Sequence, residues 1–321
     1  MKPNAWINSL QASDFLTKQL AAWPLAKQNY IALKSVYTKS VELKNFTIKI
    51  QCNPTRISSS CAKTEPTHIQ ERKCFLCLEN QPTEQFRLFF GSHYYFLCNP
   101  YPIFPEHFTI VSRKHIDQQI LSRIEDFLDL TKRLDKFTIF YNGPKSGASA
   151  PDHAHFQAVT RNSMPLDREW EQQMIRYGKS VWEENNGNIH TLENYLRNGF
   201  IIQAKTKKTA ISLFEKIYAC LHIEEGDMEP MMNIFGQYVD NSWVIIIIPR
   251  KKHRPKQFYA TGDERLITSP GVADIGGVFI TPREEDFNKI TPDILEDIYT
   301  QICFDDSEIT KFAEQLTVNQ K

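Results

Sequence analysis

The sequence predicts an α+β fold made of two related halves. Its 321 residues leave room for about two domain-sized units, because domains usually contain roughly 100–200 residues. Strand-like apolar segments and amphipathic helices occur in both halves. An aliphatic strand running into a basic turn with a terminal histidine occurs at 108–115 and again at 244–253, which suggests a diverged duplication.

The first half is expected to be rich in strands. Its expected elements are a helix at 14–23, a strand at 41–52 that is clearest from Phe46, a polar loop at 53–72, strands at 88–90, 94–97 and 108–111, an amphipathic helix at 120–134, a strand at 137–141, a loop at 142–152, and a strand at 153–160. Pro24 ends the first helix, because proline interrupts the helical hydrogen bonds.

The second half uses similar elements. We expect a helix at 209–221, strands at 243–249 and 278–281, and a helix at 292–303. The charged, Asn-rich stretch between Asn162 and Asn198 is where the boundary is expected. The predicted units are therefore residues 1–165, carrying the catalytic site, and residues 166–321.

Composition excludes several classes of protein. The 38 Lys and Arg residues balance 38 Asp and Glu residues, which argues against nucleic-acid binding through bulk positive potential, although a local patch could hold a few phosphates. The longest aliphatic run, Val244–Ile248, is far shorter than the ~20 residues of a membrane-spanning helix. The first thirty residues contain no unbroken apolar stretch typical of a secretory signal. We expect a soluble, cytoplasmic protein that binds neither nucleic acid nor membrane.

Two of the seven cysteines have a spacing that indicates chemistry. Cys74 and Cys77 form a C-x-x-C pair, which can be half of a metal site, a redox pair or a coincidence. A redox pair belongs at a helix start, whereas Pro82 follows closely here and the helical signal is poor. A metal site needs two more ligands. The other cysteines are expected to pack as small apolar residues.

The most informative segment is residues 142–158. On a strand, His153, His155 and Gln157 would share one face, because residues two apart point to the same side. The Gly- and Ser-rich loop before them can present backbone N–H and hydroxyl groups to phosphate oxygens. A partly exposed strand with incidental polar residues is the alternative, but the loop and the glutamine favour a site.

This segment resembles the histidine-triad superfamily. S-G-A-S followed by H-x-H-x-Q is similar to the branch containing galactose-1-phosphate uridylyltransferase, diadenosine tetraphosphate phosphorylase and GDP-hexose phosphorylase, in which glutamine replaces the third histidine of the hydrolases. Residues 99–115 resemble the family's strand before its long helix, and residues 269–278 resemble a late segment more weakly. The resemblance is firm over about residues 74–160. It implies two diverged histidine-triad-like halves, each an antiparallel sheet with helices packed on it.

The resemblance also implies a zinc site. The corresponding ligands are Cys74, Cys77, His115 and His153, with His107 as a competitor for the position of His115. Two thiolates and two imidazoles suit tetrahedral, structural zinc.

The residue types suggest how the site would act. Neutral His155 is a competent nucleophile toward the α-phosphorus of a nucleotide, and Gln157 can donate a hydrogen bond to phosphoryl oxygens. The expected substrate-binding residues are Asn142, Lys145, Ser146, Gly147 and Ser149. Solvated positions are expected instead for Asn53, Arg56 and Lys63, and for the basic cluster Arg250, Lys251, Lys252, His253 and Arg254.

The expected function is phosphorylase-type nucleotidyl transfer. A nucleoside diphosphate sugar or dinucleoside polyphosphate would be cleaved through a covalent nucleotidyl-histidine, with phosphate as acceptor. The alternatives are a hexose-1-phosphate uridylyltransferase, for which a sugar phosphate is the acceptor, and a non-catalytic nucleotide-binding module. The nucleobase, the sugar and the oligomeric state stay open, a homodimer being one possibility.

Overall fold

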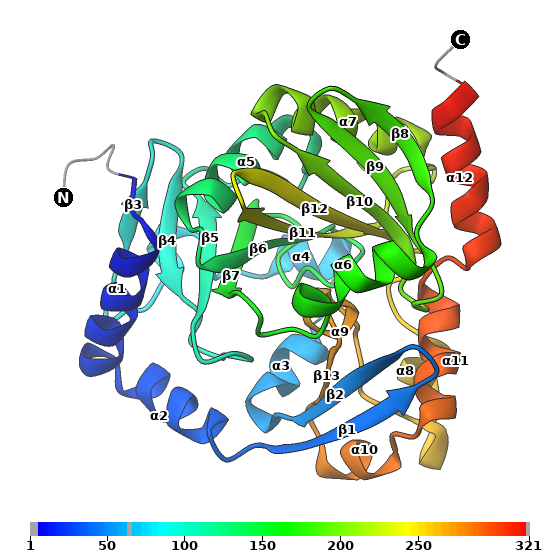
Figure 1. Cartoon of the computed structure of the whole chain (residues 1–321). Coiled ribbons are helices and arrows are strands. Elements are labelled where there is room, and N and C mark those ends of the chain that lie inside the picture. Colours follow the sequence, from blue (N-terminus) through cyan, green and yellow to red (C-terminus); the bar gives the residue numbers. More distant parts are fainter. Residues whose placement is uncertain (1–5, 63–65, 319–321) are drawn as a thin grey trace.

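The computed structural model describes residues 6–62 and 66–318. It has a mixed α+β fold in which helices pack on a ten-stranded sheet and a three-stranded sheet lies beneath it (Figure 1). The predicted α+β class is confirmed.

The large sheet is built from two halves with the same strand order. The first half runs β3 (Leu88–Phe90), β4 (Tyr94–Cys98), β5 (His107–Ser112), β7 (His155–Thr160) and β6 (Phe137–Asn142). The second half continues with β11 (Met232–Val239), β12 (Ser242–Pro249), β10 (Gly199–Ala204), β9 (Gly187–Leu192) and β8 (Ser180–Glu184). In each half the strands lie in the order first, second, third, fifth, fourth, and the two fourth strands, β6 and β11, pair antiparallel at the centre.

The similar segments 108–115 and 244–253, which suggested the duplication, lie on strands that are not equivalent in the two halves. Residues 108–111 belong to β5, the third strand of its half, whereas residues 244–248 belong to β12, the fifth strand of its half. The region expected to contain the boundary holds α6 (Leu166–Tyr177), β8 and β9. The division into units 1–165 and 166–321 stays a prediction.

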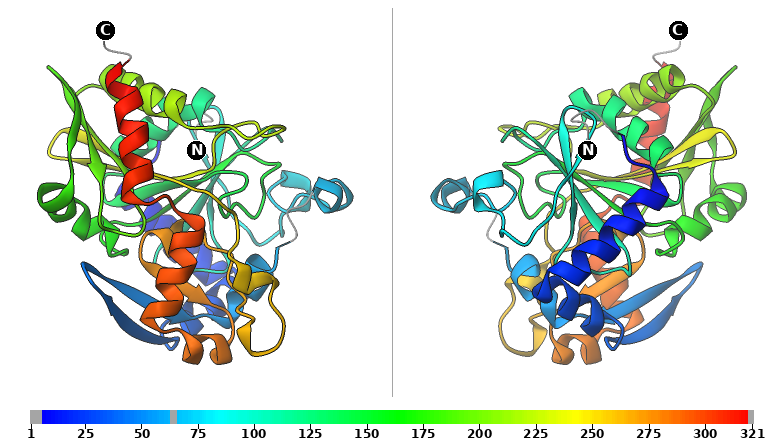
Figure 2. Two further views of the ribbon diagram at one scale, coloured as in Figure 1. Left: turned by 90° about the vertical axis from the view of Figure 1, so that its right-hand side faces the viewer. Right: turned by 90° about the vertical axis from the view of Figure 1, so that its left-hand side faces the viewer.

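One helix of each half covers the same face of the sheet. α5 (Ile124–Arg133) connects β5 to β6, and α7 (Lys207–Cys220) connects β10 to β11. Acidic residues in the first turn of α5 and basic residues in its last turn match the helix dipole. Apolar side chains of both helices join one core cluster with the sheet, and α1 (Ser9–Ala22) and α12 (Asp306–Val318) pack at its two ends (Figures 1 and 2).

The opposite face is covered mainly in the second half. The small sheet has the order β1 (Tyr37–Leu43), β2 (Phe46–Cys52), β13 (Val278–Thr281), with β13 parallel to β2. The single strand predicted at 41–52 is thus two strands of a hairpin. With α11 (Pro292–Ile302), this sheet encloses a second apolar cluster.

The remaining elements are short, apart from α2 (Pro24–Leu33). The polar segment 53–72 was predicted as a loop but contains the 3₁₀ turn η1 (Pro54–Arg56), α3 (Ile57–Ser60) and α4 (Pro66–Glu71), which projects from the body of the molecule (Figure 2). The others are η2 (Leu78–Asn80), η3 (Leu121–Arg123), α8 (Lys256–Tyr259), η4 (Gly262–Glu264), α9 (Val272–Ile275) and α10 (Glu284–Lys289). Among the described residues, no helix combines the length and apolarity needed to cross a membrane.

Candidate active site

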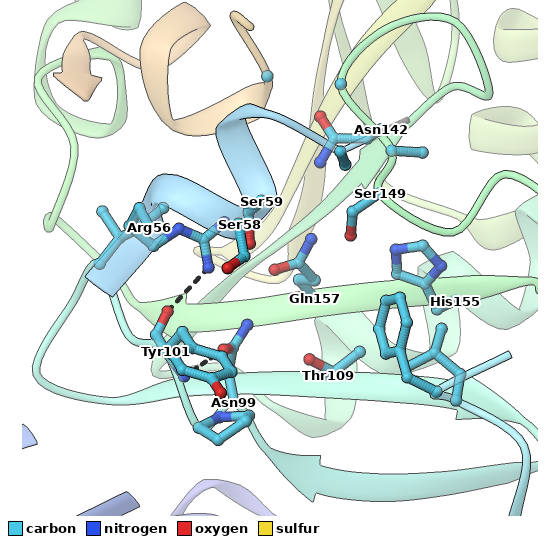
Figure 3. Close-up of a pocket in the computed structure, with 18 of the residues that line it drawn as sticks. Arg56, Ser58, Ser59, Asn99, Tyr101, Thr109, Asn142, Ser149, His155 and Gln157 are labelled. Atoms are coloured by element: carbon cyan, nitrogen blue, oxygen red, sulfur yellow. Dashed lines mark hydrogen bonds between the residues drawn. The ribbon is translucent and has the colours of Figure 1, made fainter. Parts of the chain in front are cut away.

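A cavity of about 830 Å³ opens on the face of β5 and β7 that the helices leave free. Both halves of the chain line it. The first half contributes β5, β7, the loop after β6 and the segment around η1 and α3, and the second half contributes residues 253–254 and 269–274. Figure 3 shows Arg56, Ser58 and Ser59 on one side of this cavity and His155 on the other, with Gln157 between them.

His155 is held in one orientation by buried hydrogen bonds. Its Nδ1 lies 2.8 Å from the carbonyl oxygen of His153, so Nδ1 carries the proton and Nε2 keeps its lone pair. The side chain of Gln118, fully buried, accepts a hydrogen bond from the backbone N–H of His155 and donates one to its carbonyl oxygen. Burial and the charge of Arg123 lower the pKa of His155 to about 4, which leaves the imidazole neutral near pH 7.

Gln157 is oriented by His107. The backbone N–H of Ile103 donates to Nδ1 of His107, so Nε2 of His107 carries the proton and donates to Oε1 of Gln157 at 2.8 Å. The amide nitrogen of Gln157 is then the group left to donate to a ligand. Burial and the charge of Arg56 lower the pKa of His107 to about 3. His107 was the alternative to His115 as a metal ligand. In the structure it contacts Gln157 and fixes the orientation of that amide.

The four residues expected to bind metal meet in one cluster. One ligand atom each from Cys74, Cys77, His115 and His153 lie within 4.8 Å of one another, a group that could hold a metal ion. Nδ1 of His153 lies 3.3 Å from the sulfur of Cys74, and Nδ1 of His115 lies 3.1 Å from the sulfur of Cys77. The sequence placed His153 on the same strand face as His155. His153 instead precedes β7 and turns toward the cysteines, while His155 and Gln157 line the cavity.

Neighbouring groups prepare these side chains for a cation. Nε2 of His153 donates to the carbonyl oxygen of Ser112 at 2.8 Å, which leaves Nδ1 free to coordinate. The carboxylate of Asp152 lies 3.8 Å from Nε2 of His115 and pairs with Arg72. Burial and the adjacent Cys74 sulfur raise the pKa of the Cys77 thiol to about 11, so two thiolates here require a positive ion.

The loop after β6 is only partly available to a ligand. Three of the expected substrate-binding residues, Asn142, Gly147 and Ser149, line the cavity. Lys145 pairs with Asp227 and is not among the lining residues, and Ser146 is fully buried behind them. Both residues lie away from the cavity wall because the loop folds back on the second half, where Asn233 donates to the backbone oxygen of Ser146 at 2.7 Å. Their role in substrate binding stays a prediction.

Several lining residues were missed or assigned to solvent. Arg56, His253 and Arg254 line the cavity although exposed loops were expected. Asn53 is buried and donates to the carbonyl oxygen of Pro102, and Lys63 lies outside the described residues. Other lining residues not singled out from sequence include Ser58, Ser59, Asn99, Tyr101, Thr109 and Ser269. Ser58 and Ser59 belong to a polar segment, which is typical of any exposed loop. The other four belong to segments 99–115 and 269–278, whose resemblance to the family was their sequence signal.

Comparison with known proteins supports the fold. A family model described as a domain of unknown function (DUF4922) matches residues 15–160. No curated protein matches the sequence. The crystal structure of yeast Ap4A phosphorylase Apa2 is similar with a TM-score of 0.53 at 14% identity, covering 88% of this chain and 94% of that chain. Structures of the same protein in complex with AMP and with Ap4A have the same TM-score and identity. The present chain thus has a fold similar to that of yeast Apa2.

Proposed function

We propose that the protein is a nucleotidyltransferase of the phosphorylase type. Its substrate would be a nucleoside diphosphate sugar or a dinucleoside polyphosphate, and inorganic phosphate the acceptor. One observation carries the proposal. His155, with Nε2 unprotonated, and Gln157, with its amide nitrogen available, lie on one face of β7 and line a single cavity with a Gly- and Ser-containing loop.

The first step would transfer the nucleotidyl group to His155. The lone pair of Nε2 attacks the α-phosphorus, an N–P bond forms, and the bond to the bridging oxygen breaks, so that the remaining phosphorylated fragment leaves with the electron pair. The imidazole becomes positively charged on forming this bond. Its Nδ1–H donates to the carbonyl oxygen of His153, which stabilises that charge.

The second step would reverse the first with another nucleophile. An oxygen of inorganic phosphate attacks the same phosphorus, the N–P bond breaks, and neutral His155 is regenerated with a nucleoside diphosphate as product. Gln157 would donate to a phosphoryl oxygen in both steps. Because an amide is a poor general acid, the site favours leaving groups and acceptors that need no proton, such as phosphates.

Zinc is the metal that the cluster would hold. Three sulfur–nitrogen distances in the group of two cysteines and two histidines are 3.1–3.5 Å, close to the roughly 3.5 Å edges of a tetrahedron with zinc at its centre. The ion would supply a structural cross-link. His115 follows β5 and His153 precedes β7, so binding would tie the C-x-x-C loop to the strand that carries His155.

Support for small anionic ligands comes from the cavity itself. Arg56, Arg254 and the amide of Gln157 line it together. The cited complexes of yeast Apa2 contain AMP and Ap4A, and ligands of this chemistry fit the present proposal.

Product analysis with a substrate panel tests the proposal. Diadenosine polyphosphates and ADP-, GDP- and UDP-sugars are incubated with the protein and with a His155→Asn variant, with no acceptor, with inorganic phosphate or with a hexose 1-phosphate. Binding of the same compounds is measured by titration calorimetry. We expect cleavage of at least one compound that requires phosphate, yields a nucleoside diphosphate and is lost in the variant. Cleavage that instead requires a hexose 1-phosphate would favour the uridylyltransferase alternative. Nucleotide binding without any cleavage would favour a non-catalytic module.

A further inference from the structure

The turn after β12 holds buried positive charge that the proposed chemistry does not use. This basic turn comprises Arg250, Lys251, Lys252, His253 and Arg254. Arg250 is 3% exposed and Arg254 is 7% exposed. The hydrogen bonds of these two guanidinium groups within the described chain go to backbone carbonyls, Asn233 and Ser269 rather than to carboxylates. Burying an unpaired charge is costly. The charge of Asp274 acts on Arg250, so the buried charge for which an anion is expected is that of Arg254.

Buried arginine alone does not imply a ligand in this protein. Arg197 is also buried, but it stacks on Phe46, Tyr195 and Tyr299 and does not line the cavity. Arg254 stacks on Phe258 as well, yet it faces the cavity together with His253 and Ser269. The position on the cavity wall is what separates Arg254 from Arg197.

The surroundings of His253 have a positive potential. Burial, followed by the charges of Arg254, Arg250 and Lys145, lowers the pKa of His253 to about 3. Of the acidic groups nearby, Asp227 pairs with Lys145, and Asp274 accepts hydrogen bonds from backbone N–H groups of Gly271 and Ile280. Nε2 of His253 lies 3.4 Å from the hydroxyl oxygen of Ser269, which is also 3.0 Å from Nε of Arg254.

A chain of hydrogen bonds connects the basic turn to the loop after β6. Arg250 donates to Oδ1 of Asn233 at 2.7 Å, and Nδ2 of Asn233 donates to Oδ1 of Asn142 at 2.8 Å. The same Oδ1 of Asn142 accepts from the backbone N–H of Val272. Asn142 is thus linked to the basic turn, and Figure 3 shows its side chain near those of Ser149 and Gln157. One substrate could contact both ends of this arrangement.

We infer that Arg254, His253 and Ser269 form a second phosphate-binding subsite, contributed by the second half, in the cavity that His155 serves. The inference rests on the proposed function. The occupant is a phosphate group other than the one attacked by His155, either a distal phosphate of the substrate or the free acceptor phosphate. Arg254 would donate charge-assisted hydrogen bonds to it, and Ser269 would add a hydroxyl donor.

Equilibrium binding to the His155→Asn protein tests the subsite without requiring turnover. The probes are AMP, ATP and inorganic tripolyphosphate, measured by titration calorimetry. Arg254→Met is expected to weaken ATP and tripolyphosphate roughly tenfold or more and AMP by less than about twofold, because charge-assisted hydrogen bonds contribute on that scale. His253→Gln, a milder change, should shift the ratio in the same direction. Lys252→Met, on the exposed residue of the same turn, is the matched control and should change no affinity.

Two further results separate the sources of the phosphate. If Arg254→Met also abolishes binding of inorganic phosphate to the protein saturated with AMP, the subsite holds the acceptor. If only ATP and tripolyphosphate are weakened, it holds a distal phosphate. The inference is overturned if neither ATP nor tripolyphosphate binds, or if Arg254→Met and His253→Gln, verified as folded by thermal melting, leave the ratio of ATP to AMP affinity unchanged. Failure of the proposed function would appear separately, as absent cleavage in the substrate panel with these binding results intact.

Discussion

The two halves of the large sheet share one strand order but use the same face in opposite ways. On β7, the face that the helices leave free carries His155 and Gln157 and opens to the cavity. On β12, the fifth strand of the second half, the same face carries Val244, Ile246 and Ile248, which pack in the apolar cluster between the large sheet and the small sheet. The difference shows that the topology does not itself create the site. What creates it is polar residues on a strand that the small sheet leaves uncovered.

The cluster of Cys74, Cys77, His115 and His153 lies in the first half. Among the changes considered, its loss is expected to have the largest effect on stability. Replacing Cys74 with serine should abolish zinc binding and lower the free energy of unfolding by about 3 kcal/mol or more, because a closed structural site couples metal binding to folding. Metal content and thermal melting measure both changes. The exposed Cys61, replaced by serine, is the control and should alter neither. A wild-type protein purified without zinc, melting at the same temperature as the variant, would contradict the assignment.

Exchanging residue types between the two strands tests the comparison itself. Ile246→Gln should destabilise the fold by about 3 kcal/mol, because it buries an amide in an apolar cluster. Gln157→Leu should cost only about 1 kcal/mol, since Gln157 borders the cavity, but should greatly reduce any turnover. Denaturant unfolding and the phosphorolysis assay measure these two outcomes. Equal destabilisation by both changes would show that the two faces are not used differently.

Gly147 marks a close contact between the halves. Its φ is +97°, and a Cβ there would lie 2.4 Å from the Cα of Gly271 in the second half. We expect Gly147→Ala to destabilise the protein by about 2 kcal/mol and to weaken nucleotide binding, because both segments line the cavity. Gly226→Ala is the matched control. Gly226 has φ +83° with open space around it, so only the smaller conformational cost of about 1 kcal/mol should appear. Identical effects at the two glycines would argue against the contact.

Asp167 lies where β6 of the first half pairs with β11 of the second half. Its replacement is expected to have the smallest effect on stability. Its carboxylate accepts hydrogen bonds from Thr138 on β6 and Gln237 on β11. Burial raises its pKa to about 6, above the roughly 3.9 expected in the unfolded chain. The folded state therefore holds the proton more tightly, so this group lowers stability as the pH rises from about 4 to 6, and the loss persists at higher pH.

The Asp167→Asn variant should consequently gain about 1 kcal/mol relative to wild type between pH 5 and pH 8. Denaturant unfolding at the two pH values measures this gain. Asp240→Asn, at an exposed turn, should show no such change. A difference between wild type and Asp167→Asn that does not vary with pH would contradict the shifted pKa.

The helices and strands that could be predicted are those in which apolar residues recur at a regular spacing along the sequence. The alternation at Phe46–Cys52 and the amphipathic pattern of α5 identified elements correctly. The apolar positions change phase at Lys44 and Asn45, from 41 and 43 to 46, 48, 50 and 52. The hairpin turn there was missed because no glycine or proline marks it. A duplication was expected from the similarity of segments 108–115 and 244–253, but these segments lie on strands that are not equivalent. The equivalent strands could not be identified from the sequence, because strand pairing depends on contacts between distant residues.

The candidate site divides in the same way. His155 and Gln157 lie on one strand, so their common face followed from spacing alone. The contributions of Arg56 and Arg254 depend on the segments around α3 and β12 meeting at one cavity, which nothing local encodes. The ion pair of Lys145 with Asp227 could not be predicted, because it depends on a residue more than eighty positions away.

The central claim is that His155 becomes covalently nucleotidylated. Intact-protein mass spectrometry of the enzyme mixed with substrate, without added phosphate and quenched in base, tests it most directly, because phosphoramidates of histidine are hydrolysed in acid. We expect a mass increase equal to one nucleotidyl group, absent from His155→Asn and removed by inorganic phosphate. A substrate that is turned over with no adduct in wild type, or an adduct that persists in His155→Asn, would contradict it.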